Sequence, residues 1–225
     1  MGNFTHMLLT AAAVLAAIGV AFATEPSFGT FTDTRDGQTY KTVKIGKQTW
    51  MAQNLNYKAD SSWCYEDKVD NCKKYGRLYA WNAAKKACPT GYHLPPSEEW
   101  DSLGRAVGSK KQRGVHGYIS WYVACKKLKT KSGWYDYSSE WAWNGVENGN
   151  GTDDYGFSAL PGGYYSTTKG ELNVLGSYGY WWTATEHILD NSAFCKKIYH
   201  AYDYVNGYFT DKGLGYSVRC VADRP

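Results

Sequence analysis

Six cysteines restrict the fold of this chain more than any other feature, because each disulfide holds two separate points of a chain together. They lie at positions 64, 72, 88, 125, 195 and 220. The sequence has no CxxC pair and no histidine-rich spacing of the kind that binds zinc. We therefore expect disulfides, which also indicate an oxidising compartment.

The positions of the cysteines favour three pairs. Cys64 and Cys72 bracket the short acidic loop "YEDKVDN", and a bond between them is expected to contribute about 2.5 kcal/mol. Cys88 and Cys220 both belong to predicted buried faces. Because their bond would close a long loop, it is expected to stabilise the fold by about 4 to 5 kcal/mol. By elimination, Cys125 is expected to pair with Cys195.

The N-terminal segment predicts export. Residues 7–23 are apolar apart from Thr10, and Ala21-Phe22-Ala23 matches a signal-peptide cleavage site. Residues 1–23 are therefore either a cleaved signal peptide or a retained apolar segment. The second interpretation stays open because residues 1–7 supply no Lys or Arg for the start of a signal peptide. A retained segment would act as a membrane anchor or as a polymerising helix, and only in that case is a membrane partner expected.

Residues 24–35 are interpreted as a linker and residues 36–225 as a single domain. The run "GQTYKTVKIGKQTWMAQNL" predicts a hairpin that turns at Gly46-Lys47. From 76 to 88, apolar residues recur at helical spacing and predict a first helix, which Pro89 ends.

A second helix is predicted to start at Ser97. We expect Ser97 to be its N-cap, after an extended approach through Pro95 and Pro96. Trp100, Leu103 and Val107 would form its buried face, and this interpretation makes "HLPPSEEW" a fixed connection between two helices.

The second half of the chain is richer in loops and strands. Gly, Asn, Ser and aromatic residues dominate after about residue 110, which indicates long loops around short strands. Asn206-Gly207 is typical of a type I′ hairpin turn, and residues 214–220 alternate so that Cys220 faces inward. At least one of Trp181 and Trp182 should lie in the core, because neighbours on a strand face opposite sides. With no internal repeat, the pattern predicts one α+β domain.

Several ordered blocks between Asp36 and Asp223 resemble a known family, the Fibrobacter succinogenes major paralogous domain. The blocks are "DGQTYKTVKIGKQTWMAQNLNY", "YGRLYAWNAAKKACPTGYHLPPSEEWDSL", "GNGTDDYGFSALPGGYY", "GYWWTATE" and "GYSVRCV". The resemblance implies a C-type-lectin-like single domain with two helices, short antiparallel strands and long loops, disulfide-stapled and distantly similar to the formylglycine-generating enzyme domain. The shared positions are His93, Leu94, Pro95, Glu99 and Trp100 at the helix start, then Arg219 and Cys220.

The chain departs from the family at two cysteines and in one loop. Cysteines are unusual in the family at positions 125 and 195, which makes their mutual pairing more attractive. Residues 133–149 look like an individual elaboration of this chain, in a region where the implied fold varies its binding surface.

An aromatic cluster in this loop region is the candidate ligand-binding site. Its flat rings suit stacking on sugars or contact with a partner protein, and the other interpretation is that they cover the core beneath the loops. The cluster consists of Trp134, Tyr135, Tyr137, Trp141 and Trp143.

The adjacent run "NGVENGNGTDD" is a candidate calcium site. It supplies oxygen donors of the kind that calcium takes, although such residues are also common turn formers. The donors are Asn144, Glu147, Asn148, Asn150, Asp153 and Asp154, of which the last four are the candidate ligands. No other cofactor is expected.

The composition favours a binding domain over an enzyme. The net charge of +4 is scattered, so no nucleic-acid partner is expected. No nucleophile-base pair or paired carboxylates stand out, and His93 is interpreted as structural. We expect an exported bacterial surface domain, secreted or on the cell surface, that recognises polysaccharide or a surface protein through its loops. The alternative is a structural subunit of an extracellular filament or surface layer, assembled through the apolar N-terminus and the aromatic surface.

Overall fold

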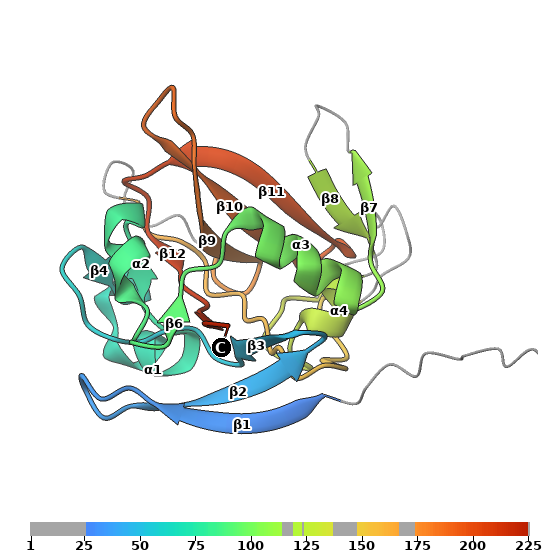
Figure 1. Cartoon of the computed structure of the whole chain (residues 1–225). Helices are drawn as coiled ribbons and strands as arrows, with labels where there is room; N and C mark the ends of the chain where they lie inside the picture. Colours follow the sequence, from blue (N-terminus) through green and yellow to red (C-terminus); the bar gives the residue numbers. More distant parts are fainter. Residues whose placement is uncertain (1–25, 114–118, 123, 137–147, 167–173, 225) are drawn as a thin grey trace, which may run out of the picture.

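The computed structural model describes residues 26–113, 119–122, 124–136, 148–166 and 174–224. It has an α+β architecture with few helices and two mainly antiparallel sheets (Figure 1). No helix in these ranges has the length and apolar character needed to cross a membrane.

The smaller sheet contains both the first and the last strand of the described chain. Its strand order is β1-β2-β3-β13-β6. The strands are β1 (Ser27–Thr32), β2 (Thr39–Ile45), β3 (Gln48–Met51), β13 (Val221–Ala222) and β6 (Tyr92–His93). The predicted hairpin is confirmed, because β2 and β3 pair on either side of Gly46-Lys47.

The larger sheet forms the upper part of the molecule in Figure 1. Its order is β4-β5-β12-β9-β10-β11-β8-β7. The strands are β4 (Ser62–Trp63), β5 (Leu78–Tyr79), β12 (Tyr216–Ser217), β9 (Tyr178–Glu186), β10 (Ser192–Tyr199), β11 (Tyr204–Asp211), β8 (Ile119–Tyr122) and β7 (Lys110–Arg113). The C-terminal segment passes from β12 to β13 and so connects the two sheets.

Four α-helices occur in the described residues, two more than expected. The predicted pair are α2 (Trp81–Ala87) and α3 (Ser97–Ala106), and the additional helices are α1 (Val69–Tyr75) and α4 (Ala124–Leu128), with a short 3-10 helix at Tyr65–Asp67. The first predicted helix starts later than expected because Leu78 and Tyr79 form β5.

The predicted cap of α3 is wrong. The N-cap residue is Pro96, and Ser97 is the first helical residue without a side-chain capping bond. The Ser97 amide instead donates to Thr185 Oγ1 at 2.9 Å. A hydroxyl from β9 thus accepts a hydrogen bond from a free amide at the start of α3, which is the capping role that we expected of the Ser97 side chain.

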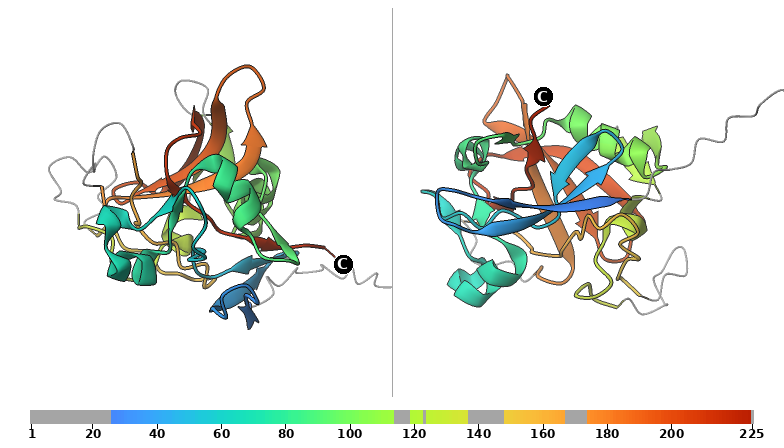
Figure 2. Two further views of the ribbon diagram at one scale, coloured as in Figure 1. Left: turned by 90° about the vertical axis from the view of Figure 1, so that its left-hand side faces the viewer. Right: turned by 60° about the horizontal axis from the view of Figure 1, so that its bottom comes forward.

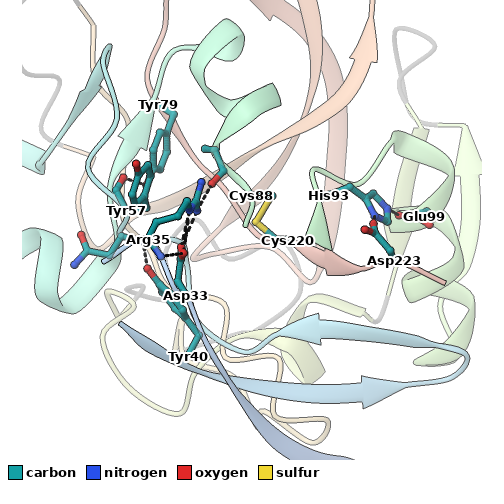
Figure 3. The surroundings of a disulfide bond; sticks show 12 residues. Asp33, Arg35, Tyr40, Tyr57, Tyr79, Cys88, His93, Glu99, Cys220 and Asp223 are labelled. Atoms are coloured by element: carbon teal, nitrogen blue, oxygen red, sulfur yellow. Dashed lines mark hydrogen bonds and ion pairs between the residues drawn. A yellow bond between two sulfur atoms is a disulfide. The ribbon is translucent and has the colours of Figure 1, made fainter. Parts of the chain in front are cut away.

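The interpretation of residues 24–35 as a linker is also wrong for most of its described part. Residues 27–32 form β1, which pairs along its whole length with β2. Asp33 follows it, fully buried, and accepts hydrogen bonds from Arg35, whose guanidinium also donates to the Ala87 carbonyl at 2.7 Å (Figure 3). Backbone pairing makes this polar, Thr-rich segment part of the domain.

Asn206 and Gly207 do not form the predicted turn. Both lie within β11, where they pair with Lys197 and Lys196 of β10. The connection between β10 and β11 lies earlier, between Tyr199 and Tyr204.

Two groups of buried side chains lie on opposite faces of β9. Trp181 belongs to the group that contains Trp100 and Phe157, and Trp182 belongs to the group that contains Trp81 and Cys220. Both Trp181 and Trp182 are 0% exposed. The expectation that at least one of them lies in the core is confirmed, and both do.

Two disulfides form as expected, Cys64–Cys72 and Cys88–Cys220. The third predicted disulfide is wrong, because Cys125 and Cys195 are free and buried. The two thiols belong to the two different core groups. The larger sheet separates them, so neither sulfur reaches the other.

Candidate binding surface

The predicted aromatic cluster is divided by the structure. Trp134 is only 3% exposed and donates its indole N–H to the Ala159 carbonyl at 3.1 Å. It therefore covers the core and is not available to a ligand. Tyr137, Trp141 and Trp143 lie outside the described residues.

Tyr135 is the described member of the cluster that faces solvent. It is 54% exposed, and its amide donates to the Gly176 carbonyl at 2.9 Å. Its ring lies directly over Gly176, where an added Cβ would come within 2.7 Å of it. Gly176, which has a positive φ and no side chain, thus leaves room for the Tyr135 ring.

Tyr135 borders a row of tyrosines that the sequence analysis did not single out. His200 connects them, with ring centroids 6.4 Å from Tyr135 and 4.4 Å from Tyr199. Tyr199 stacks on Tyr178 at 4.5 Å and contacts Tyr202 at 5.0 Å. We call the five rings Tyr135, Tyr178, Tyr199, Tyr202 and Tyr204 the tyrosine surface.

The tyrosine surface is assembled from three separate parts of the chain. Tyr178 begins β9 and Tyr199 ends β10, and these two residues are direct register partners. Tyr202 is 45% exposed in the following turn and stacks on Tyr204 at 4.9 Å. The spacing in "YHAYDY" (residues 199–204) was a signal for a turn rich in exposed rings, but the prediction of a turn at Asn206-Gly207 obscured it.

The tyrosine surface presents rings that combine a flat apolar face with a polar hydroxyl. Such rings provide a large contact area at a small entropic cost, because a tyrosine has few rotatable bonds. Mutual stacking restricts these side chains before any ligand arrives. The arrangement therefore suits recognition of flat ligand faces.

The predicted calcium ligands hold turns in the structure. Asn148 Oδ1 accepts from the Asn150 amide at 2.8 Å, and Asn150 Oδ1 accepts from the Trp134 amide at 2.9 Å. The Asp153 carboxylate accepts from the amide and hydroxyl of Ser158. These contacts favour the turn interpretation.

The remaining members of this set add no calcium site. Asp154 is exposed, and Asn144 and Glu147 lie outside the described residues. Within the described ranges no group of three His, Cys, Asp or Glu side chains is placed to hold a metal ion. The oxygens of Asn148, Asn150 and Asp153 instead accept hydrogen bonds from neighbouring residues.

His93 lies between two carboxylates near the disulfide Cys88–Cys220 (Figure 3). Its Nε2 is 2.7 Å from Glu99 Oε2, and its Nδ1 is 2.6 Å from Asp223 Oδ1. Burial disfavours the charged ring, but the hydrogen bonds to Glu99 and Asp223 outweigh burial and raise the pKa of His93. The imidazole thus joins α3 to Asp223, the residue after β13.

Comparison with known proteins gives one match. The family model described as the Fibrobacter succinogenes major domain matches residues 43–222. No curated protein and no solved structure matches the chain.

Proposed function

This chain belongs to the Fibrobacter succinogenes major domain family, and from that premise we propose that it is an exported binding domain of a bacterial surface and not an enzyme. Its ligand is a polysaccharide, which it contacts through the tyrosine surface. Export is supported by the two disulfides, because such bonds persist in oxidising compartments.

We further propose that the fold is C-type-lectin-like and distantly related to the formylglycine-generating enzyme domain. Support comes from the arrangement of the chain, since β1 and β13 belong to one sheet. The described residues between α4 and β9 form no helix or named strand. In such an architecture the loops carry the contacts and the sheets hold them in place.

The observation that carries the proposed binding function is the exposure of stacked rings. Tyr135 and Tyr202 are 54% and 45% exposed, although their neighbours restrict them. Large aromatic side chains usually lose more of their surface on folding. A flat apolar sugar face would cover these rings while its hydroxyls meet the phenol oxygens and the solvent.

Glycan-array binding of the full chain tests this proposal. Tyr202→Ala is expected to weaken binding about three- to tenfold, since one aromatic contact contributes about 0.5–1.5 kcal/mol. Tyr202→Phe should retain most of the affinity. Phe209→Ala is a matched control, because Phe209 is a similarly exposed ring at 44% that lies on β11 outside the tyrosine surface.

Two outcomes would overturn the polysaccharide assignment. One is that no glycan binds while a surface protein does, in a manner sensitive to Tyr202→Ala. The other is that Tyr202→Ala and Phe209→Ala weaken glycan binding equally.

A second candidate function is a structural subunit of an extracellular filament or surface layer. It is favoured by β1, which lies at the edge of the smaller sheet, exposed over nearly its whole length. Such edges accept a strand from another chain. N-terminal sequencing and sedimentation of the native protein distinguish the two: assemblies of chains that start near Met1 support the subunit, and monomers that start at Thr24 contradict it.

A further inference from the structure

A groove lies between the β1–β2 ribbon on one side and α1 with residues 153–160 on the other. Its volume of about 850 Å³ is within the range of roughly 300–1,000 Å³ typical of ligand sites. Figure 2 (right) shows β1 and β2 crossing this underside of the molecule beside α1. The tyrosine surface contributes no residue to its lining.

A buried hydrogen-bond network fixes the walls of the groove relative to one another. Arg219 is fully buried and donates to Asn54 Oδ1 at 2.7 Å and to the carbonyls of Met51 and Phe157. Asn54 in turn donates to the Tyr75 carbonyl at 2.8 Å. β3, α1 and the 153–160 segment are thus tied to a single guanidinium, which makes the groove preorganised.

Positive charge dominates the lining. The charged residues that line the groove are four exposed lysines and one carboxylate: Lys41, Lys73, Lys74, Lys131 and Asp153. Lys41 and Lys131 form no ion pair with another described residue, whereas Lys73 pairs with Asp70 at 2.9 Å. Asp153 contributes the one negative charge among the described lining residues. The groove therefore attracts anions.

The uncharged lining residues indicate which kind of anion. Gln53 contributes an amide whose Oε1 accepts from the Lys41 backbone amide at 2.8 Å, and Gln38 and Asn56 contribute amides that bond to each other. Amide groups pair with hydroxyls as donors or acceptors. Phe28 contributes a ring that is 66% exposed and lies over Gly156, where an added Cβ would come within 2.3 Å of it. Amides, one open ring and separate ammonium groups match a polymer of hydroxyls and carboxylates.

We propose that this groove, here called the lysine groove, binds an acidic polysaccharide that carries uronate carboxylates among its hydroxyl groups. A nucleic acid fits less well, because no arginine is among the described lining residues and planar arginine forks are preferred for phosphates. The lysine groove is a second site, independent of the tyrosine surface.

Titration of the full chain with polygalacturonate tests the proposal. The double variant Lys41→Gln, Lys131→Gln is expected to raise the Kd about tenfold, because it removes two exposed charge contacts with the polymer. Added salt should weaken binding of the unmodified chain, because exposed charges are screened.

The matched control is Lys58→Gln, Lys86→Gln, which removes the same charge from two exposed lysines outside the groove. It should change the Kd less than twofold, about the spread expected from net charge alone. Equal weakening in both double variants, no binding of polygalacturonate, or equally tight binding of polyglutamate or single-stranded DNA would each overturn the proposal. Tyr202→Ala should leave uronate binding unchanged, so the two sites are tested separately.

Discussion

At the scale of single residues, neighbours in the fold decide between interpretations that composition leaves open. Trp134 and Tyr135 are adjacent in an aromatic segment, yet one is 3% and the other 54% exposed. Their positions follow from hydrogen bonds that the Trp134 amide donates to Asn150 Oδ1 and the Tyr135 amide donates to the Gly176 carbonyl. Those partners are distant in sequence, so no local pattern distinguishes the two rings.

His93 gives a prediction of pH dependence. Its pKa in the folded chain is raised above the ordinary value of 6.5. The stability that it contributes is therefore fully present below about pH 6.5 and is lost as the pH rises through the folded pKa. His93→Asn should lower the free energy of unfolding by about 1 kcal/mol or less, because the ring is 36% exposed and solvent screens the pairs.

Urea unfolding of both proteins at pH 6 and pH 9 measures this effect. The difference in the free energy of unfolding between the unmodified chain and the His93→Asn variant should be larger at pH 6 than at pH 9. A difference that grows toward pH 9 would show that the ring does not act as a cation between Glu99 and Asp223.

At the scale of elements, apolar patterns predicted the positions of helices and strands well, whereas turn residues predicted the positions of turns less well. The β2–β3 hairpin follows from β-rich runs on either side of Gly46-Lys47, and α2 and α3 follow from apolar residues that recur at helical spacing. The turn predicted at Asn206-Gly207 is wrong because an Asn-Gly pair can also lie inside a strand where packing requires a glycine. Here the Phe194 ring of β10 lies across β11, and an added Cβ at Gly207 would come within 2.5 Å of it.

Gly207→Ala should therefore destabilise the protein by about 1–3 kcal/mol through overpacking against Phe194. In a Phe194→Ala background the same substitution should cost less than about 0.5 kcal/mol, because the clash is gone. Denaturant unfolding of the four proteins gives the coupling energy. Equal costs in both backgrounds would contradict the packing explanation and favour a backbone requirement for glycine.

At the scale of the whole molecule, the disulfide Cys88–Cys220 joins α2 to the C-terminal segment across a sequence separation of 132 residues. Cys64–Cys72 closes a separation of only 8. Cys88→Ser, Cys220→Ser should cost about 5 kcal/mol and Cys64→Ser, Cys72→Ser about 2.5 kcal/mol, because a longer loop loses more entropy when it is closed. Guanidinium unfolding without reductant compares them.

Alkylation checks the same arrangement. The folded chain should resist iodoacetamide, since burial raises the pKa of both Cys125 and Cys195 to about 12. Unfolding without reductant should then expose the two free thiols that the structure shows. No labelling after unfolding would indicate that Cys125 and Cys195 are paired after all.

The amino-acid sequence by itself determined the family, the α+β class, the two disulfides and the buried faces of the main helices and strands. These features depend on residue identity at local spacing or on cysteine positions with few compatible partners. Only the tertiary structure decided that Cys125 and Cys195 lie on opposite sides of the larger sheet, that residues 27–32 extend the smaller sheet, and that five tyrosines and four groove lysines gather on two surfaces. Each of those outcomes depends on contacts between segments far apart in the chain, and such contacts leave no periodic signal in any one segment.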